Sequence, residues 1–93
     1  MGKAIKQNQS AFQVNLDAAN MVIQQLILRN IAGMIVVDFI RMERKKDRDA
    51  LLHYVQELTS EHSVKVKVFG YTRLGLFEMS RERIRSSLMN IVS

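Results

Sequence analysis

A chain of 93 residues suits one small domain or part of a larger one. Its hydrophobic fraction of 47% and charged fraction of 25% argue against a disordered chain, and the absence of cysteine excludes disulfides, thiolate zinc sites and a cysteine nucleophile. The formal net charge of +5 favours polyanionic partners such as RNA or anionic lipid, without choosing between them.

The apolar segments are too short to cross a membrane, because the longest of them, residues 31–37, stops at Asp38. The first ten residues lack the hydrophobic centre of a signal peptide. We therefore expect no membrane segment and a cytoplasmic location.

The first expected element is a helix that follows a polar lead-in. Residues 1–14 are predicted to be a flexible lead-in, and residues 15–93 to be one structural unit. Asn15 suits the N-cap position, and Asp17 suits the positive end of the helix dipole. Gly33 is expected to stop the helix. Apolar residues at helical spacing predict one buried stripe, consisting of Leu16, Ala19, Ile23, Leu26 and Ile27.

A strand and a second helix are expected next. Residues 34–40 are β-branched and apolar on both faces, which is typical of a strand covered on both sides. A second helix is predicted at about residues 43–60, where Lys45 and Asp49 are spaced for an ion pair. Its apolar stripe consists of Leu51, Leu52, Val55 and Leu58.

The last third of the chain predicts two more strands. Residues 64–68 alternate strictly, which gives one valine face and one lysine face. Residues 70–73 favour a turn, and residues 74–80 a third strand, although their composition also permits a helix. Residues 81–93 have the pattern of a short helix.

The expected fold class is therefore α/β, in the order α-β-α-β-β. We expect a small layered mixed sheet of about three strands with two main helices, in which the strand–helix–strand unit makes a right-handed parallel crossover. Such a sheet exposes an edge, which suggests that the chain belongs to something larger.

Asp38 is the most informative single position. It interrupts an apolar strand close to its carboxyl end, where α/β sheets bind ligands. A carboxylate there is costly to bury unless it is paired or binds a cation, and Mg²⁺ often takes only one or two protein carboxylates. The alternative is a structural aspartate that caps the next turn or pairs with Arg41 or Arg44.

Basic residues gather in a pattern that phosphate contacts require. Lys65 and Lys67 share a strand face, and Phe69 and Tyr71 lie close enough in sequence to stack on bases. The alternative is a solvated charged surface with Phe69 in the core. The other clustered basic residues are Arg41, Arg44, Lys45, Lys46, Arg48, Arg73, Arg81, Arg83 and Arg85.

Three blocks of the chain resemble the ribonuclease E/G family. Residues 15–19 resemble its Asn-Leu-Glu-Ala-Ala, and residues 28–42 its Leu-Arg-Asp-Leu-Gly-Gly-(Ile/Leu)-Ile-Val-Ile-Asp-Phe-Ile-Asp-Met. Residues 72–83 resemble its (Ser/Thr)-Arg-(Leu/Phe)-Gly-Leu-(Leu/Val)-Glu-Met-(Ser/Thr)-Arg-x-Arg. The blocks keep the family's order and spacing. The chain departs from the family's pattern at Asn30 and Arg41, where the family has aspartate, and at Ser86, where it has proline.

The resemblance implies a DNase I-like subdomain of a Mg²⁺-dependent endoribonuclease that cleaves single-stranded RNA. Asp38 matches one of two aspartates that hold the catalytic metal, while the other belongs to a family motif that precedes the stretch matched by this chain. Lys65 matches a candidate RNA contact, and we add Lys67 and Arg73 as RNA-binding residues. The resemblance allows a homo-oligomer of the full-length protein.

Three functions are therefore open at the level of sequence. The first is part of such an endoribonuclease, in which case the isolated fragment is expected to be inactive because half of its metal site is missing. The second is a non-catalytic RNA-binding module, which needs only the basic cluster. The third is a structural or interaction domain with no role in RNA binding.

Overall fold

The computed structural model of the protein describes residues 10–61 and 65–82. Over these ranges the chain forms α1 (Ala11–Leu28), β1 (Gly33–Val37), α2 (Lys45–Glu61), β2 (Val66–Tyr71) and β3 (Phe77–Arg81). The predicted α/β class and the order α-β-α-β-β are confirmed. The helix predicted for the tail lies, apart from its first two residues, outside the described residues, as do residues 1–9 of the predicted lead-in.

The three strands form one sheet in the order β1-β3-β2. Both pairings are antiparallel, so β1 and β2 run in the same direction on either side of β3. The parallel orientation expected of the strand–helix–strand unit is present, but β3 lies between the two strands, so the sheet is antiparallel rather than mixed. The reason is the short β2–β3 connection, which folds β3 back beside β2 and leaves the other edge of β3 free to pair with β1.

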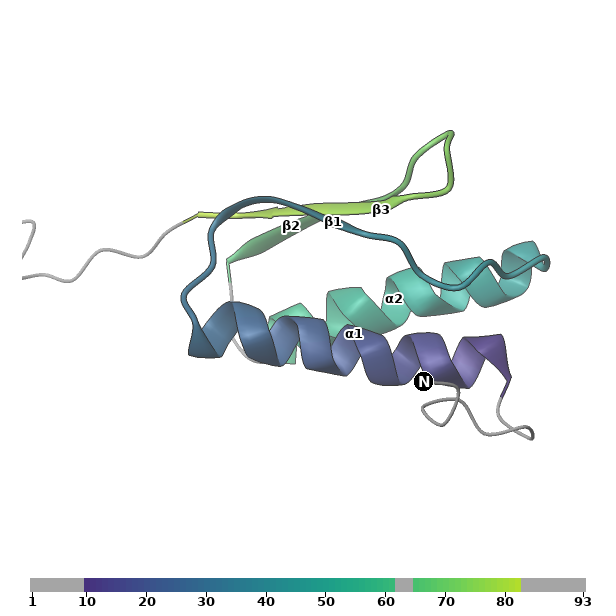
Figure 1. Ribbon diagram of the computed structural model, residues 1–93, viewed down its shortest axis with the longest axis horizontal. Coiled ribbons are helices and arrows are strands. Elements are labelled where there is room, and N and C mark those ends of the chain that lie inside the picture. The colour runs from purple at the N-terminus through teal and green to yellow at the C-terminus, as the bar shows by residue number, and fades with distance from the viewer. Residues whose placement is uncertain (1–9, 62–64, 83–93) are drawn as a thin grey trace, which may run out of the picture.

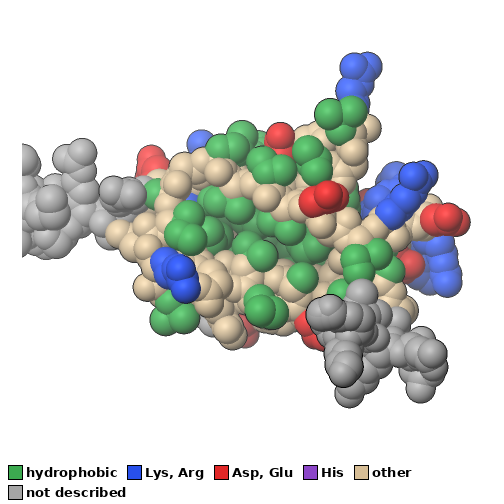
Figure 2. All heavy atoms as spheres, in the orientation of Figure 1, with side chains coloured by type: hydrophobic (Ala, Val, Ile, Leu, Met, Phe, Trp, Pro, Cys, Tyr) green, Lys and Arg blue, Asp and Glu red, His purple; other side chains and the backbone are tan. Residues whose placement is uncertain are grey.

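The two helices lie side by side against one face of the sheet (Figure 1). Apolar side chains of both helices meet those of the sheet and of the segment that follows β1, and hydrophobic side chains are visible between the helices and the sheet in Figure 2. The buried hydrophobic core consists of Ala19, Ile23, Leu26, Phe39, Met42, Leu51, Val55, Leu58, Phe77 and Met79. Neither helix of the described ranges is long and apolar enough to span a membrane.

The other face of the sheet carries no helix of the described part of the chain (Figure 1). Met34 and Val36 on β1 are 62% and 49% exposed, and Phe69 on β2 is 58% exposed. The prediction that the first strand is covered on both faces is therefore not met within these ranges. The sequence pattern misled because the outward residues of β1 are as apolar as the inward ones.

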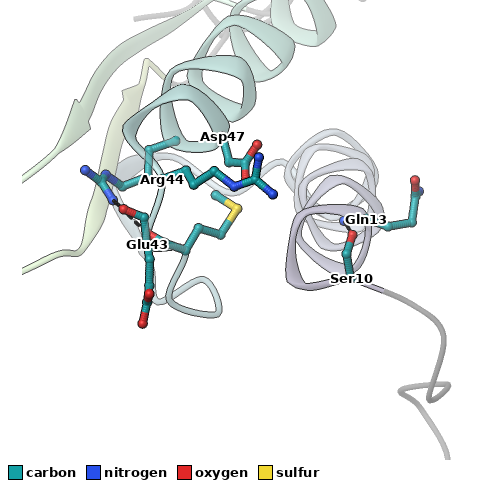
Figure 3. Close-up of polar contacts among 7 residues, drawn as sticks. Ser10, Gln13, Glu43, Arg44 and Asp47 are labelled. Carbon is teal, nitrogen blue, oxygen red and sulfur yellow. Dashed lines mark hydrogen bonds and ion pairs between the residues drawn. The ribbon is translucent and has the colours of Figure 1, made fainter.

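Helix α1 begins five residues earlier than predicted. Ser10 is its N-cap, and its Oγ accepts a hydrogen bond of 3.1 Å from the backbone N–H of Gln13 (Figure 3). Residues 11–14 of the predicted lead-in are therefore helical. Asn15 is not a cap but a buried residue within the helix, 1% exposed, because its side chain is used in a tertiary contact.

A buried arginine closes the other end of α1. One guanidinium nitrogen of Arg81, on β3, donates to the backbone oxygens of Leu26 at 2.9 Å and Ile31 at 2.8 Å. The helix ends at Leu28, before the glycine at position 33 that was predicted to stop it, and Asn30 makes the reversal with a φ of 49°. Because Arg81 is only 8% exposed, it does not belong to the accessible basic cluster.

The β2–β3 hairpin turns later than the sequence suggested. The backbone N–H of Gly75 donates to the carbonyl oxygen of Thr72 at 3.0 Å, and Gly75 has a φ of 86°, which favours glycine. The predicted turn at residues 70–73 instead extends β2 to Tyr71, and the third strand begins at Phe77 rather than at residue 74. Leu74 lies at the hairpin tip and is 87% exposed.

Candidate metal and RNA site

Asp38 directly follows the last residue of β1, at the carboxyl end of the strand. Its side chain is exposed, and no residue of the described ranges makes a hydrogen bond or an ion pair with its carboxylate. Arg44, one of its expected partners, directly precedes α2. Its Nε instead lies 3.9 Å from Oδ2 of Asp47 in the first turn of that helix (Figure 3). The structural alternative, in which Asp38 caps a turn or pairs with a nearby arginine, is therefore not realised.

Asp38 lines a hollow of about 570 Å³. Three segments far apart in sequence form it: the stretch after β1, the first turn of α2, and the β2–β3 hairpin. Basic side chains gather at this end of the molecule, below the projecting hairpin (Figure 2). The residues that line the hollow are Asp38, Phe39, Ile40, Arg41, Met42, Arg48, Tyr71, Thr72, Arg73, Leu74 and Gly75.

Three arginines face one aspartate in this hollow. Arg41 and Arg73 are exposed and make no ion pair with any residue of the described part of the chain. Arg48 is held in place, because its guanidinium donates to the backbone oxygens of Met42 at 2.6 Å and Glu43 at 3.0 Å. Guanidinium groups suit phosphate oxygens in both charge and geometry, so the hollow is suited to an anionic ligand.

Asn15 fixes the segment that follows Asp38. Its amide nitrogen donates to the carbonyl oxygen of Ile40 at 2.8 Å, and its amide oxygen accepts from the backbone N–H of Ile40 at 2.9 Å. Two hydrogen bonds to one backbone unit hold that segment in a single position relative to α1. The sequence analysis missed this role of Asn15. The only signal was that a polar residue directly precedes Leu16, the first residue of the predicted apolar stripe.

Tyr71 and Thr72 bring the hairpin to the rim of the hollow. The Tyr71 ring packs edge-on against Phe77, with ring centroids 5.4 Å apart. Burial raises the pKa of the Tyr71 hydroxyl above its ordinary value, and the charge of Arg48 acts in the opposite direction. Thr72 Oγ1 accepts from the backbone N–H of Leu76 at 3.2 Å, which shapes the loop that carries Arg73.

The structure divides the predicted RNA-binding residues between two places. Arg73 lies with Asp38 at the carboxyl ends of β1 and β2. Lys65 and Lys67 lie at the opposite end of β2, beside Ser80 and Glu82 of the neighbouring strand and its extension. Since a strand advances by about 3.3 Å per residue, Lys65 is roughly 20 Å from the hollow.

The residues of the hollow can supply one ligand to Mg²⁺ but not a complete metal site. Mg²⁺ takes oxygen ligands, commonly one or two carboxylates together with water and substrate phosphates. Within the described ranges the carboxylate of Asp38 has no partner, and its side chain is exposed. However, residues 10–61 and 65–82 contain no group of three acidic, histidine or cysteine side chains that could hold a metal ion. Asp38 is the one acidic residue that lines the hollow in this part of the chain.

The sequence of the chain is similar to those of known ribonucleases. A model of the ribonuclease E/G family matches residues 1–84. The chain is 38% identical over 81 residues to ribonuclease G of Escherichia coli strain K12, covering 87% of this chain and 17% of that protein. It is 36% identical over 84 residues to ribonuclease G of Haemophilus influenzae, covering 90% and 17%.

Ribonuclease E is also among the relatives. The chain is 36% identical over 80 residues to ribonuclease E of Escherichia coli strain K12, covering 86% of this chain and 8% of that protein. The chain thus spans less than a fifth of the length of any of these three relatives. Since the family model covers most of the chain, this protein belongs to the ribonuclease E/G family.

Proposed function

We propose that the chain forms part of a Mg²⁺-dependent endoribonuclease that cleaves single-stranded RNA in RNA processing and decay. The observation that carries the proposal is the free carboxylate of Asp38, which lies at the carboxyl end of β1 in a hollow lined by three arginines. Membership of the ribonuclease E/G family supports RNA as the substrate. A cytoplasmic location and a homo-oligomer of the full-length protein belong to the same proposal.

Each residue of the hollow has a separate role in this proposal. Asp38 would supply one oxygen ligand to Mg²⁺, whose chemistry in such a site would be activation of water and stabilisation of charge on the phosphate. Arg41 and Arg73, which line the same hollow, would bind phosphate oxygens of the RNA. Tyr71 is protonated at neutral pH, as an ordinary tyrosine is, and burial raises its pKa further, so its hydroxyl can donate a hydrogen bond at the rim.

The backbone around Asp38 is held rigid for this task. Asn15 fixes Ile40 through two hydrogen bonds, and Arg48 fixes the carbonyl groups of Met42 and Glu43. Phe39 is buried against Phe77, with ring centroids 5.4 Å apart. A ligand held on a fixed segment keeps its geometry, which a metal site requires.

The test uses a chimera in which the matched segment of Escherichia coli ribonuclease G is replaced by this chain. We expect the chimera to cleave single-stranded RNA with Mg²⁺, and Asp38→Asn to reduce the rate by about 100-fold or more. Asp49→Asn is the matched control, because Asp49 is an exposed aspartate paired with Lys45 on the outside of α2. Equal rates for the chimera and its Asp38→Asn variant would overturn the assignment.

The isolated chain is expected to show little or no cleavage, because one carboxylate binds Mg²⁺ weakly. The measurement is the decay of a labelled single-stranded RNA in the presence of Mg²⁺ and of EDTA. Robust Mg²⁺-dependent cleavage that disappears with Asp38→Asn would show that the chain alone completes its metal site.

The second candidate is a non-catalytic RNA-binding module. The incomplete set of metal ligands in the described ranges and the exposed lysines of β2 favour it. It predicts salt-dependent RNA binding that survives Asp38→Ala and is lost when Lys65 and Lys67 are replaced by alanine. Failure to bind RNA at low salt would favour a purely structural domain instead.

A further inference from the structure

The outward face of β2 carries a row of three exposed side chains. Lys65 immediately precedes the strand, and Lys67 and Phe69 follow at intervals of two residues, so all three point away from the helices. Val66 and Val68 alternate with them and pack against the core. The row therefore consists of two cations and one aromatic ring on a single face of one strand.

A β-bulge separates Phe69 from the paired residues around it. Val68 pairs with Met79 and Gly70 with Glu78, so Phe69 is the additional residue and has no partner on β3. Beyond the bulge, Tyr71 lies opposite Phe77, and its ring packs on the core side. The bulge thus keeps one aromatic ring outward and turns the next one inward.

The exposure of Phe69 needs an explanation. A phenylalanine that is 58% exposed leaves much of its apolar surface in water, which burial against a ligand would remove. Gly70 at the next position is buried and has a φ of 93°, and a Cβ added there would lie 3.7 Å from the methyl groups of Leu52 on α2. The ring is therefore presented on a firmly packed strand rather than on a loop.

Both lysines beside Phe69 are available to a polyanion. Neither lysine of the row has an ion-pair partner among the residues that the structure describes. Two carboxylates lie on the adjacent strand and its extension, Glu78 beyond the bulge and Glu82 near Lys65. The strand itself carries no acidic residue.

We propose that this row is a binding track for single-stranded RNA, in which one base stacks on the ring of Phe69 while Lys65 and Lys67 contact the neighbouring phosphates. Only the choice of RNA rather than another polyanion rests on the proposed function. An aromatic ring in line with lysines on an open strand face suits single strands, since the ring stacks on any base and the lysines follow the backbone.

The track leads toward the hollow at Asp38. Both lie along β2, with Lys65 at its start and Tyr71 at its end, where the hollow begins. A strand that runs along β2 beyond Phe69 would reach the hairpin that carries Arg73. The track would hold the RNA several nucleotides away from the phosphate that faces Asp38. It would therefore contribute to the affinity for RNA without touching the reacting atoms.

The test measures binding of the purified 93-residue chain to two fluorescent oligonucleotides by anisotropy in EDTA. One is a short oligouridine, and the other has the same phosphate backbone with abasic sugars. Phe69→Ala should weaken oligouridine binding by about fivefold or more and leave abasic binding unchanged. Lys67→Gln should weaken both and lower the dependence of affinity on salt. Met21→Ala, which removes an exposed apolar side chain on α1, away from the track and the hollow, is the control and should change neither.

Other outcomes would overturn the track. They are unchanged oligouridine binding in Phe69→Ala, or equal losses for both oligonucleotides with unchanged circular dichroism. A self-association that the substitution abolishes would show instead that another protein surface covers this face. Phe69→Tyr keeps a stacking ring and should retain affinity, which guards against a folding defect in Phe69→Ala. Because EDTA removes metal, the result is independent of whether Asp38 binds Mg²⁺.

Discussion

Individual polar residues of this chain fall into two groups that the sequence does not separate. Asn15 and Arg81 are buried and bound to backbone groups distant in sequence, so they hold the fold together. Asp38 and Arg73 are exposed and have no partner within the described ranges, so their charges are available to a ligand. The distinction depends on three-dimensional surroundings, because the same residue types occur in both groups.

Asn15→Ala should destabilise the protein by about 2–4 kcal/mol. The substitution removes two hydrogen bonds and leaves the N–H and carbonyl groups of Ile40 without their partner. Urea unfolding measures the change. Gln13→Ala on the same helix is the control, because its amide makes a single exposed bond to Asp17, and it should change stability by less than about 0.5 kcal/mol. Equal unfolding midpoints for the two variants would contradict the role of Asn15.

Tyr71 should make the protein less stable in alkali. Burial raises the pKa of its hydroxyl above the ordinary value of 10.0 that it has in the unfolded chain. The resulting contribution to stability is fully present below the unfolded pKa and is lost as pH rises through the folded pKa. Wild type should therefore lose more free energy of unfolding above about pH 10 than Tyr71→Phe does. Parallel pH profiles of the two proteins would refute this.

At the scale of elements, helix periodicity located both helices, but local chemistry did not locate the start of α1. Ser10 and Asn15 are both good N-cap residues, and only the packing of α1 shows that the first one caps it. The predicted Lys45–Asp49 pair of α2 is confirmed, with 3.0 Å between Nζ and Oδ2. Contacts within one helix are predictable because they depend only on spacing.

Ser10→Ala should cost about 1 kcal/mol of stability, because the first turn of α1 loses the hydrogen bond to the N–H of Gln13. Ser10→Asp, which keeps an acceptor and adds favourable charge at the helix N-terminus, should be close to wild type. Thermal or urea unfolding measures both variants. Ser60→Ala, an exposed serine near the end of α2, is the control. Neutral behaviour of Ser10→Ala would place the start of α1 elsewhere.

The sheet shows a similar division at this scale. Alternation of valine and lysine predicted the inward and outward faces of β2, and Lys65 and Lys67 do face solvent. It did not predict the bulge at Phe69, the position of the turn at Gly75, or the insertion of β3 between β1 and β2. Those features depend on which strand edges are available for pairing, and this availability cannot be read from the sequence.

The whole molecule has one covered and one open sheet face in its described part (Figure 1). The covered face forms the core, while the open face carries the exposed residues of β1 and β2. The candidate metal site lies at one end of this layer, and the lysines of β2 lie at the other. This separation suits a long ligand such as single-stranded RNA better than a small molecule.

The sequence by itself determined the family, the α/β class, the order of the elements and the importance of Asp38 as a candidate ligand. These conclusions depend on motifs, periodicity and spacing, which are properties of the chain. Only the tertiary structure decided that Asp38 is free, that Arg73 joins it while Lys65 and Lys67 do not, and that Phe69 rather than Tyr71 faces solvent. Burial and pairing between distant segments produce these results, because packing chooses among side chains that look equivalent in sequence.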